Sequence, residues 1–375
     1  MPLFDVYPLY VVTPVRAKGV HVYDAEDQEY LDLYGGHAVI SIGHNHPEYS
    51  KRIKNQLDKI GFYSNAIQNP LQVELANLLE AQSQCNGYQL FLCSSGAEAN
   101  ENALKLASFY TGKKRVIAFK NAFHGRTSAA VASTDNQKIN APLNAQQKVT
   151  FLPFNDAKAL EKELAKGDVC AVIFESIQGV GGLDEPSEAF VYQMEALCKQ
   201  YNTCLIADEV QAGFGRTGTF FGFQKYNIQP HIISMAKGMG NGFPVGGIFI
   251  HPSIKPAYGM LGTTFGGNHL ACVATLAVLE TLEKENLQHN AAQMGAYFKE
   301  QAQQLPKIQK IKGRGLMLGL EFDFEVGELR KKLIYDHRIF TGGSSNKKLL
   351  RILPPLTIEK KHIDTLINAL KTLLK

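Results

Sequence analysis

The spacing of apolar and polar positions changes several times along the chain, and each change predicts a different element. In the middle of the chain, short apolar runs alternate with longer segments whose apolar residues recur every three or four positions. We expect strands at 89–93, 115–119, 169–174, 203–207, 231–234 and 246–250, and helices that include 97–110, 156–165 and 190–200. This alternation predicts an α/β fold with a mostly parallel central sheet flanked by helices.

The two ends of the chain show other patterns. Residues 18–34 alternate apolar and polar positions around a polar turn at 25–27, which predicts an antiparallel hairpin. Residues 268–304 form one long helical pattern, and strands at 315–322 and 348–352 precede a closing helix from Glu359. We therefore expect a large domain at 56–267 and a smaller α+β domain from both termini. Its N-terminal part would be 1–55, and 268–375 would supply a linking helix and its C-terminal part.

Composition and charge exclude several classes of protein. The 375 residues include 39 Lys+Arg and 35 Asp+Glu, a formal net charge of +4 that is too small to indicate nucleic acid or a membrane surface as a partner. No apolar run approaches the roughly 18 residues of a membrane helix, and the first residues do not resemble a signal peptide, so we expect a cytoplasmic protein. The six cysteines lack metal-ligand spacing, and neither a metal site nor a disulfide is expected.

Residues suited to ligand binding follow the first two predicted strands. In open α/β sheets, ligands bind beyond the carboxyl ends of the strands. The first strand leads into 94–97 (SSGA), where a helix begins and free N–H groups can bind a phosphate. A serine helix cap explains the same residues equally well. The second strand leads into 123–126 (FHGR), an aromatic ring, an imidazole and a guanidinium that suit a flat ring with an anionic substituent.

Three charged residues stand at the ends of later strands. Glu175 and Asp208 end apolar runs, where a carboxylate is costly without a cationic partner, and a structural ion pair explains each about as well as a ligand site. Lys237 follows another apolar run, where desolvation would lower the pKa of the amine and make it nucleophilic, as Schiff-base chemistry requires. Taken alone, a lysine that extends to solvent is the simpler interpretation.

These weak signals agree with one another. No Asp or Glu occurs between Glu209 and Glu280, whereas Arg216, Lys225, Lys237 and Lys255 do, which favours anionic ligands in these loops. A phosphate cradle, a stacking aromatic, a strand-end aspartate and a later lysine together predict a pyridoxal phosphate site.

Five segments carry a resemblance to a known family: SSGAEANE (94–101), FHGR (123–126), DEVQAGFGRTG (208–218), AKGMGNGFP (236–244) and TTFGGN (263–268). The chain resembles the class III, fold-type I pyridoxal-phosphate-dependent aminotransferases over nearly its whole length, and among them most closely the acetylornithine aminotransferases. The resemblance implies pyridoxal 5′-phosphate as cofactor and a homodimer with shared active sites. It also implies transfer of the terminal amino group of N2-acetylornithine to 2-oxoglutarate in arginine biosynthesis. N-succinylornithine, ornithine and 4-aminobutyrate stay open as alternative donors.

The resemblance implies roles for individual residues as well. Lys237 would bond covalently to the cofactor and move the proton, and Asp208 would pair with the pyridine nitrogen. Thr264 would reach the phosphate of the neighbouring subunit's cofactor, and Arg126 would bind a substrate carboxylate. His44 and His46 would be structural rather than a metal pair. The residues expected at the cofactor are Ser95, Gly96, Ala97, Phe123, Glu175, Asp208, Gln211, Lys237 and Thr264, and those expected at the substrate are Arg126, Thr263 and Arg351.

One position departs from the family pattern. Related ornithine-type enzymes often have E-P-I-Q-G-E, and their second glutamate pairs with an arginine that matches Arg351 and masks it when the other substrate enters. Here the segment 175–180 is ESIQGV, so Val180 stands in the place of that glutamate. The sequence leaves open how Arg351 is masked.

Two other classes of protein compete with this interpretation. Residues 213–218 (GFGRTG) match the dinucleotide-binding pattern of nicotinamide-dependent oxidoreductases. That pattern needs an acid about twenty residues later, which the acid-free stretch lacks, and 219–221 (TFF) begin a helix poorly. A non-catalytic binding protein on the same scaffold would be expected to lack Lys237 or Asp208, and both are present.

Overall fold

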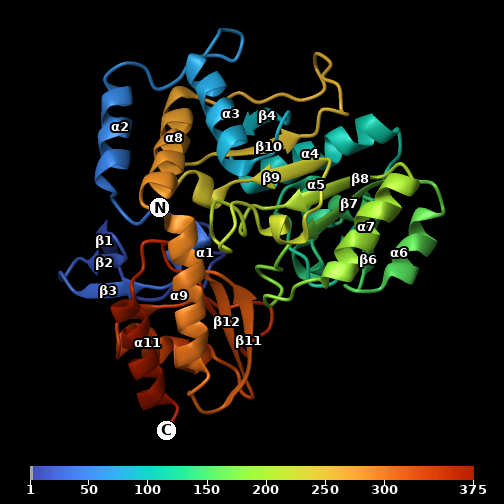
Figure 1. Cartoon of the computed structure of the whole chain (residues 1–375). Helices are drawn as coiled ribbons and strands as arrows, with labels where there is room; N and C mark the ends of the chain where they lie inside the picture. Colours follow the sequence, from blue (N-terminus) through green and yellow to red (C-terminus); the bar gives the residue numbers. More distant parts are fainter. Residues whose placement is uncertain (1–2) are drawn as a thin grey trace.

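A seven-stranded sheet forms the centre of the computed structural model, which describes residues 3–375 (Figure 1). Only β10 runs antiparallel to its neighbours, so the sheet is mostly parallel as predicted. The six strands predicted for this sheet are confirmed to within one residue at either end. The four-residue edge strand β6 was not predicted. In spatial order the strands are β4 (Gln89–Cys93), β10 (Gly246–Ile250), β9 (Ile232–Met235), β8 (Cys204–Asp208), β7 (Val169–Glu175), β5 (Arg115–Phe119) and β6 (Val149–Leu152).

Helices cover both faces of this sheet because alternate strand residues point to opposite sides. Val116 and Ala118 of β5 belong to the same buried cluster as residues of α4 (Gly96–Thr111). Ile117 and Phe119 belong to the cluster that contains residues of α3 (Pro70–Ser83), α7 (Glu188–Gln200) and α8 (His269–Lys284). The helices predicted at 97–110, 156–165 and 190–200 are confirmed as α4, α6 (Ala157–Leu164) and α7.

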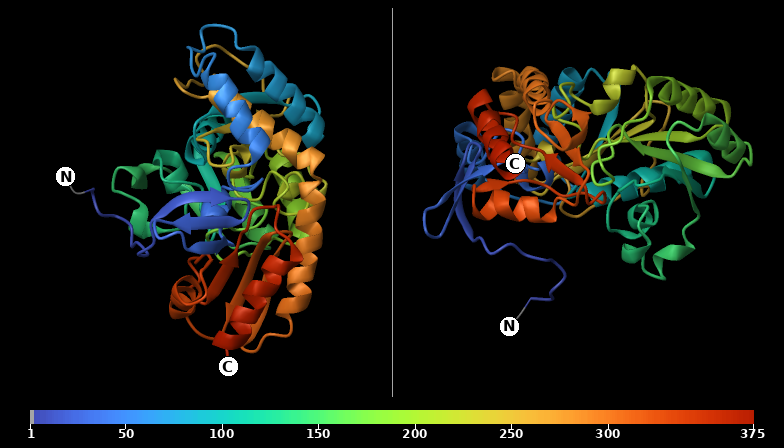
Figure 2. Two further views of the ribbon diagram at one scale, coloured as in Figure 1. Left: turned by 90° about the vertical axis from the view of Figure 1, so that its left-hand side faces the viewer. Right: turned by 90° about the horizontal axis from the view of Figure 1, so that it is seen from below.

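Strands from both termini meet in a second, smaller part of the molecule. The predicted hairpin is formed by β2 (His21–Asp24) and β3 (Glu29–Asp32), with β1 (Pro14–Lys18) beside β2 and the C-terminal β13 (Ile339–Phe340) parallel to β3. A three-stranded sheet of β11 (Ile308–Arg314), β12 (Met317–Phe322) and β14 (Leu349–Ile352) lies with α10 (Gly327–Tyr335) and α11 (Lys360–Leu373). Figure 2 shows the N-terminal segment extending away from the body. The domain division at 55/56 and 267/268 stays a prediction, and 55/56 falls within α2 (Pro47–Leu57).

The long helical pattern at 268–304 is two helices rather than one. α8 ends at Lys284 and α9 (Leu287–Ala302) begins after Asn286, whose φ of 51° places it in the left-handed region. Asparagine tolerates this region better than most residues, so it can end one helix and start another. α8 packs against α2 and α3, whereas α9 continues to β11 and α11 of the smaller part (Figure 1).

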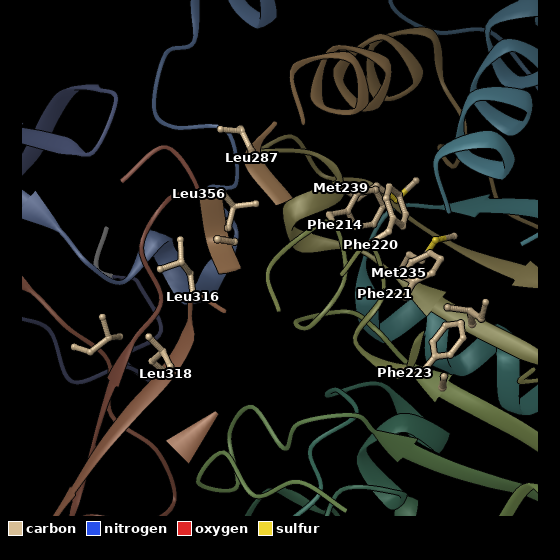
Figure 3. Close-up of a cluster of buried hydrophobic side chains, with 14 of the residues drawn as sticks. Phe214, Phe220, Phe221, Phe223, Met235, Met239, Leu287, Leu316, Leu318 and Leu356 are labelled. Atoms are coloured by element: carbon tan, nitrogen blue, oxygen red, sulfur yellow. The ribbon is translucent and has the colours of Figure 1, made fainter. Parts of the chain in front are cut away.

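One apolar core joins the two parts of the molecule (Figure 3). Phe220 and Phe221 meet edge to face with centroids 4.8 Å apart, and Met235 and Met239 belong to the same cluster. Because Met235 ends β9 and Met239 lies two residues after Lys237, this packing fixes the loop that carries the lysine. Leucines of the smaller part enter the same cluster, namely Leu287, Leu316, Leu318 and Leu356.

The segment 213–218 ties the two parts together and does not form a dinucleotide-binding turn. It is a series of turns, and the element that follows is the short 3₁₀ helix η3 (Gly222–Tyr226). Arg216 is buried, and its guanidinium donates to the carbonyl oxygens of Leu316, Pro354 and Ile40. The strand–turn–helix context that the dinucleotide pattern requires is therefore missing from this segment.

All six cysteines are buried and carry free thiols. Within residues 3–375, no helix combines the length and the hydropathy needed to cross a membrane.

Candidate active site

A cavity of about 370 Å³ opens where β7, β8 and β9 end and α4 begins. This is the edge of the sheet at which open α/β folds bind ligands. Nine of the twelve predicted site residues line the cavity, although they come from five separate segments of the chain. These nine are Ser95, Gly96, Ala97, Phe123, Arg126, Glu175, Asp208, Gln211 and Lys237.

The start of α4 has the features of a phosphate cradle. Ser95 is the N-cap, and its hydroxyl accepts a hydrogen bond from the Glu98 N–H at 3.2 Å, so the capping interpretation is confirmed, whereas phosphate binding stays a prediction. The first N–H groups of a helix have no partner inside it, which leaves those of Gly96 and Ala97 free for an anion. Glycine is required at 96 by close packing, because a Cβ there would lie 2.6 Å from Val210 Cγ1.

Asp208 ends β8 as a buried carboxylate with three hydrogen-bond donors. Its Oδ2 accepts from Asn100 Nδ2 and His124 Nδ1, each at 2.7 Å, and its Oδ1 accepts from the Val210 N–H at 3.0 Å. Asn100 also donates to the His124 carbonyl at 2.7 Å, which fixes both partners. Sequence reasoning did not assign Asn100 and His124 this role, although both lie in segments that it singled out.

Lys237 occupies a left-handed backbone position with φ 48° at the start of η4 (Lys237–Met239). Burial lowers the pKa of its amine to about 8, although the carboxylates of Asp208 and Glu175 oppose the shift and Arg351 adds to it. Within residues 3–375 its Nζ forms no ion pair and no hydrogen bond. Lys237 is therefore an amine that is partly neutral near neutral pH, as a nucleophile must be.

Glu175 ends β7 beside Asp208, and its carboxylate accepts hydrogen bonds from backbone N–H groups instead of pairing with a cation. Its two carboxylate oxygens accept from the Phe123 N–H at 3.0 Å and the Gly179 N–H at 2.8 Å. Burial raises the pKa of Glu175 to about 7. The ion pair considered for a strand-end carboxylate does not occur at Glu175 within the described residues. Instead, the carboxylate fixes the position of Phe123, the residue expected to stack on the cofactor.

The residues in the cavity match the groups of pyridoxal phosphate one by one. Gln211 donates through Nε2 to the His37 carbonyl at 3.1 Å, and its buried Oε1 has no partner within residues 3–375, so it can accept from the ring hydroxyl. The free N–H groups of α4 suit the phosphate, Asp208 suits the pyridine nitrogen, and Lys237 suits the aldehyde carbon. The chemistry of this donor set therefore fits the predicted cofactor.

Arg351 lies next to the cavity rather than in its wall. It is buried in β14, and its Nη1 donates to the carbonyl of Gly179, a lining residue, at 2.7 Å. Arg126, in contrast, is exposed at the cavity. The site thus has two guanidinium groups that differ in exposure, and both are available for carboxylates.

Thr263 and Thr264 do not reach the cavity in this chain. Thr263 accepts a hydrogen bond from the Gly266 N–H at 3.1 Å, and Thr264 is exposed. Because the resemblance assigns Thr264 to the neighbouring subunit's cofactor, its role stays a prediction, as does that of Thr263.

Most of the cations in the acid-free stretch after Glu209 lie away from the cavity wall. Of its four cations, only Lys237 lines the cavity. Arg216 donates to backbone carbonyls, Lys225 Nζ lies 3.9 Å from Glu185 Oε2, and Lys255 is exposed. Lys237 is therefore the one of these four cations that lines the cavity, and the expectation that the whole stretch favours anions stays a prediction.

His44 and His46 are each hydrogen-bonded to a different carboxylate. His44 Nε2 is 2.8 Å from Asp32 Oδ2, and His46 Nε2 is 2.9 Å from Glu285 Oε1. Across residues 3–375, no group of three or more His, Cys, Asp or Glu side chains could hold a metal ion.

Comparison with known proteins gives a consistent result. The model of the family "Aminotransferase class-III" matches residues 5–374. Acetylornithine aminotransferases of Bacillus subtilis (strain 168) and Aquifex aeolicus (strain VF5) are each 39% identical to the chain. The matches cover 98% and 99% of this chain and 96% and 99% of those proteins.

Solved structures agree in fold. The ornithine aminotransferase of Toxoplasma gondii ME49 superposes with a TM-score of 0.91 at 26% identity, covering 98% of this chain and 91% of that one. The ornithine δ-aminotransferase of Plasmodium falciparum gives 0.84 at 29% identity, covering 98% and 94%. The predicted fold class is confirmed. The chain therefore belongs to the class III aminotransferases and is a pyridoxal-phosphate-dependent transaminase of fold type I.

Proposed function

We propose that this transaminase moves the terminal amino group of N2-acetylornithine to 2-oxoglutarate, giving N-acetylglutamate 5-semialdehyde and glutamate, a reaction of arginine biosynthesis. The observation that carries the proposal is the juxtaposition of Lys237 and Asp208 in one cavity with two guanidinium groups, Arg126 and Arg351, beside it. The similarity to acetylornithine aminotransferases over nearly the whole chain supports this choice of donor.

The protein's own residues would hold the cofactor and handle protons. When bound, pyridoxal phosphate supplies a ring that accepts electrons from the carbon bearing the amino group. Asp208, held in place by its three hydrogen-bond donors, would pair with the ring nitrogen and keep a proton on it. Lys237 Nζ, with a pKa of about 8, can both give and take a proton near neutral pH.

The remaining residues would position the ring. Ser95, Gly96 and Ala97 would hold the phosphate at the start of α4. Phe123, whose backbone Glu175 fixes, would stack on the ring, and Gln211 would accept from the ring hydroxyl. These contacts would fix the ring between Lys237 and Asp208.

The two arginines would bind the carboxylates of the substrates. Arg126 at the cavity surface suits the carboxylate of the amino donor, and Arg351 suits that of 2-oxoglutarate. We further propose a homodimer in which Thr263 and Thr264 complete the neighbouring site, since this chain does not bring them to its own cavity. The cytoplasmic location also stays a prediction.

An absorption spectrum of the purified protein tests this proposal. We expect a visible band from the cofactor bonded to Lys237, and we expect N2-acetylornithine, added without any keto acid, to bleach it to the absorbance of the pyridoxamine form. A band that does not respond would reject this donor, and ornithine, N-succinylornithine and 4-aminobutyrate would be tested in its place. No band after addition of pyridoxal phosphate would reject the role of Lys237.

A further inference from the structure

Arg351 is a buried cation that no carboxylate neutralises. Its Nη1 donates to the Gly179 carbonyl at 2.7 Å, its Nε donates to the Gly343 carbonyl, and its Nη2 lies 3.4 Å from Tyr34 Oη. Within residues 3–375 its guanidinium forms no ion pair. Val180 has no charged side chain that could pair with Arg351, and its backbone carbonyl accepts a hydrogen bond from the Ser345 N–H at 2.8 Å. The partners of Arg351 are therefore all uncharged.

Among residues 3–375, Tyr34 is the one side chain that hydrogen-bonds to Arg351, and it is itself held by His37. The phenolic oxygen is within hydrogen-bond distance of His37 Nδ1, and the two rings lie 4.7 Å apart. A guanidinium can only donate, so the Tyr34 oxygen accepts from Arg351 and its proton is free for His37 Nδ1. The Arg351 Cζ also lies 5.8 Å from the Tyr34 ring centroid, within cation–π range.

His37 can accept that proton because it is uncharged. Although His37 is exposed in this chain, partial desolvation together with the charges of Arg351, Lys237 and Arg330 lowers its pKa to about 4. At neutral pH its Nδ1 is therefore available as an acceptor. The hydrogen bonds run in one direction, from Arg351 to Tyr34 and from Tyr34 to His37.

The backbone that carries these residues adopts a conformation that most sequences avoid. The four residues 35–38 have φ values of 53°, 55°, 68° and 64°, and two of them, His37 and Ala38, are not glycine. Left-handed non-glycine residues persist only where the surroundings enforce them. Here Asp32 Oδ1 accepts from the N–H groups of Tyr34 and Gly35, and the His37 carbonyl accepts from Gln211.

We propose that Tyr34 and His37 are positioning residues for Arg351, and that this uncharged pair orients the guanidinium for the carboxylate of the keto acid. The inference rests on the proposed function, in which Arg351 binds that carboxylate. With uncharged partners, the carboxylate need not displace an anion from Arg351. The bond between His37 and Gln211 also links this pair to the cofactor end of the cavity.

Separate half-reactions test the proposal with Tyr34→Phe. The pyridoxamine form, prepared by adding pyridoxamine phosphate to the apoprotein, is mixed with 2-oxoglutarate, and the pyridoxal form is mixed with N2-acetylornithine. We expect kcat/KM for 2-oxoglutarate to fall about tenfold, mainly through KM, because a charged hydrogen bond that orients Arg351 is lost. The donor half-reaction should stay within about twofold of the wild type, because it does not use Arg351.

A matched pair of variants at His37 tests whether the Tyr34 hydroxyl needs a hydrogen-bond acceptor at this position. Asparagine tolerates the left-handed backbone and offers an amide oxygen, so His37→Asn should remain close to the wild type. His37→Ala lacks the acceptor and should match Tyr34→Phe. The double variant Tyr34→Phe/His37→Ala should be no worse than either single variant, because the two residues act as a unit.

Several outcomes would overturn the proposal: an unchanged keto-acid half-reaction in Tyr34→Phe, equal losses in both half-reactions, or a His37→Asn variant as impaired as His37→Ala. The cofactor band in each variant reports whether the site has folded. Because the keto-acid half-reaction needs no amino donor, failure of N2-acetylornithine would reject the proposed donor and leave this arm intact. The donor half-reaction would then be measured with whichever of ornithine, N-succinylornithine or 4-aminobutyrate bleaches the cofactor band.

Discussion

Two buried arginines, Arg115 and Arg351, have opposite electrostatic surroundings. At the start of β5, Arg115 donates from Nε to both oxygens of Asp168 at 3.0 Å and from Nη1 to Glu163 at 2.7 Å. These carboxylates raise the pKa of Arg115. Arg351 has carbonyls and a phenol instead, and burial lowers its pKa.

Whether a carboxylate of the chain neutralises a buried cation decides whether that cation can still bind an anionic ligand. The charge of Arg115 is neutralised by its own fold, at the edge of the sheet where β5 begins. Arg351 and Lys237 lie near the opposite edge, where the parallel strands end, and neither has a carboxylate within ion-pairing distance in residues 3–375. An unneutralised charge is not sufficient. Arg216 is also held by carbonyls, but they belong to residues that do not line the cavity, whereas Arg351 donates to the lining residue Gly179. We therefore expect a ligand-binding cation to combine an unmatched charge with a place at the cavity.

Removal of the unmatched lysine should have the largest effect. We expect Lys237→Ala to lose turnover by at least about 10⁴-fold, because no other amine lines the cavity, while the protein still folds. Steady-state transamination with N2-acetylornithine and 2-oxoglutarate measures this loss. Lys255→Ala, an exposed lysine of the same acid-free stretch, is the matched control and should keep wild-type activity. Measurable turnover in Lys237→Ala would contradict the assignment.

Neutralising Arg351 should affect one substrate rather than both. We expect Arg351→Gln to lower kcat/KM for 2-oxoglutarate by about 100-fold, since the variant loses the buried charge proposed to bind the carboxylate. The half-reaction with N2-acetylornithine should change far less. Stopped-flow measurement of both half-reactions separates the two effects, and an equal loss in both would show that Arg351 supports the whole site.

The lowered pKa of Lys237 predicts a pH dependence for cofactor attachment. Only the neutral amine can react with the aldehyde, and the neutral fraction rises with pH until the pKa of about 8 has been passed. The rate at which the visible band appears after addition of pyridoxal phosphate to apoprotein should therefore rise about tenfold per pH unit below pH 8 and level off near pH 9. A rate that keeps rising past pH 10 would indicate an ordinary lysine that the cavity does not perturb.

The grouping of the strand-end residues at the cavity could be predicted from the sequence, because strand ends in an α/β sheet converge at one edge. That rule brought Glu175, Asp208 and Lys237 together without knowledge of their distances. The hydrogen-bond partners of the site residues could not be predicted from the sequence. Asn100 and Asp208 are 108 positions apart, and Tyr34 and Arg351 are 317 apart. No local pattern links such pairs, since their contact depends on how separate elements pack.

Backbone conformation limited the prediction in a similar way. The helical spacing of 268–304 continues through Asn286, yet a single left-handed residue divides the segment into α8 and α9. The left-handed turn at 35–38 includes His37 and Ala38, which a pattern of glycines would not reveal. In both places tertiary packing, rather than apolar spacing, decides the conformation.

The smallest expected effect concerns the neutralised arginine and falls on stability rather than on rate. Arg115→Gln leaves the Asp168 carboxylate without the arginine that pairs with it, and leaves Glu163 with Lys166 as its remaining partner. Because the Asp168 side chain is 54% exposed, water offsets part of the loss, and we expect unfolding free energy to fall by about 2 kcal/mol. Urea unfolding of holoenzyme at a fixed concentration of pyridoxal phosphate measures this change, and both half-reactions should keep wild-type rates. Arg351→Gln should show the reverse, with little change in unfolding free energy, because it leaves no carboxylate unpaired. If Arg351→Gln lost as much stability as Arg115→Gln, the two arginines would both be structural, and the distinction between a neutralised and an available cation would fail.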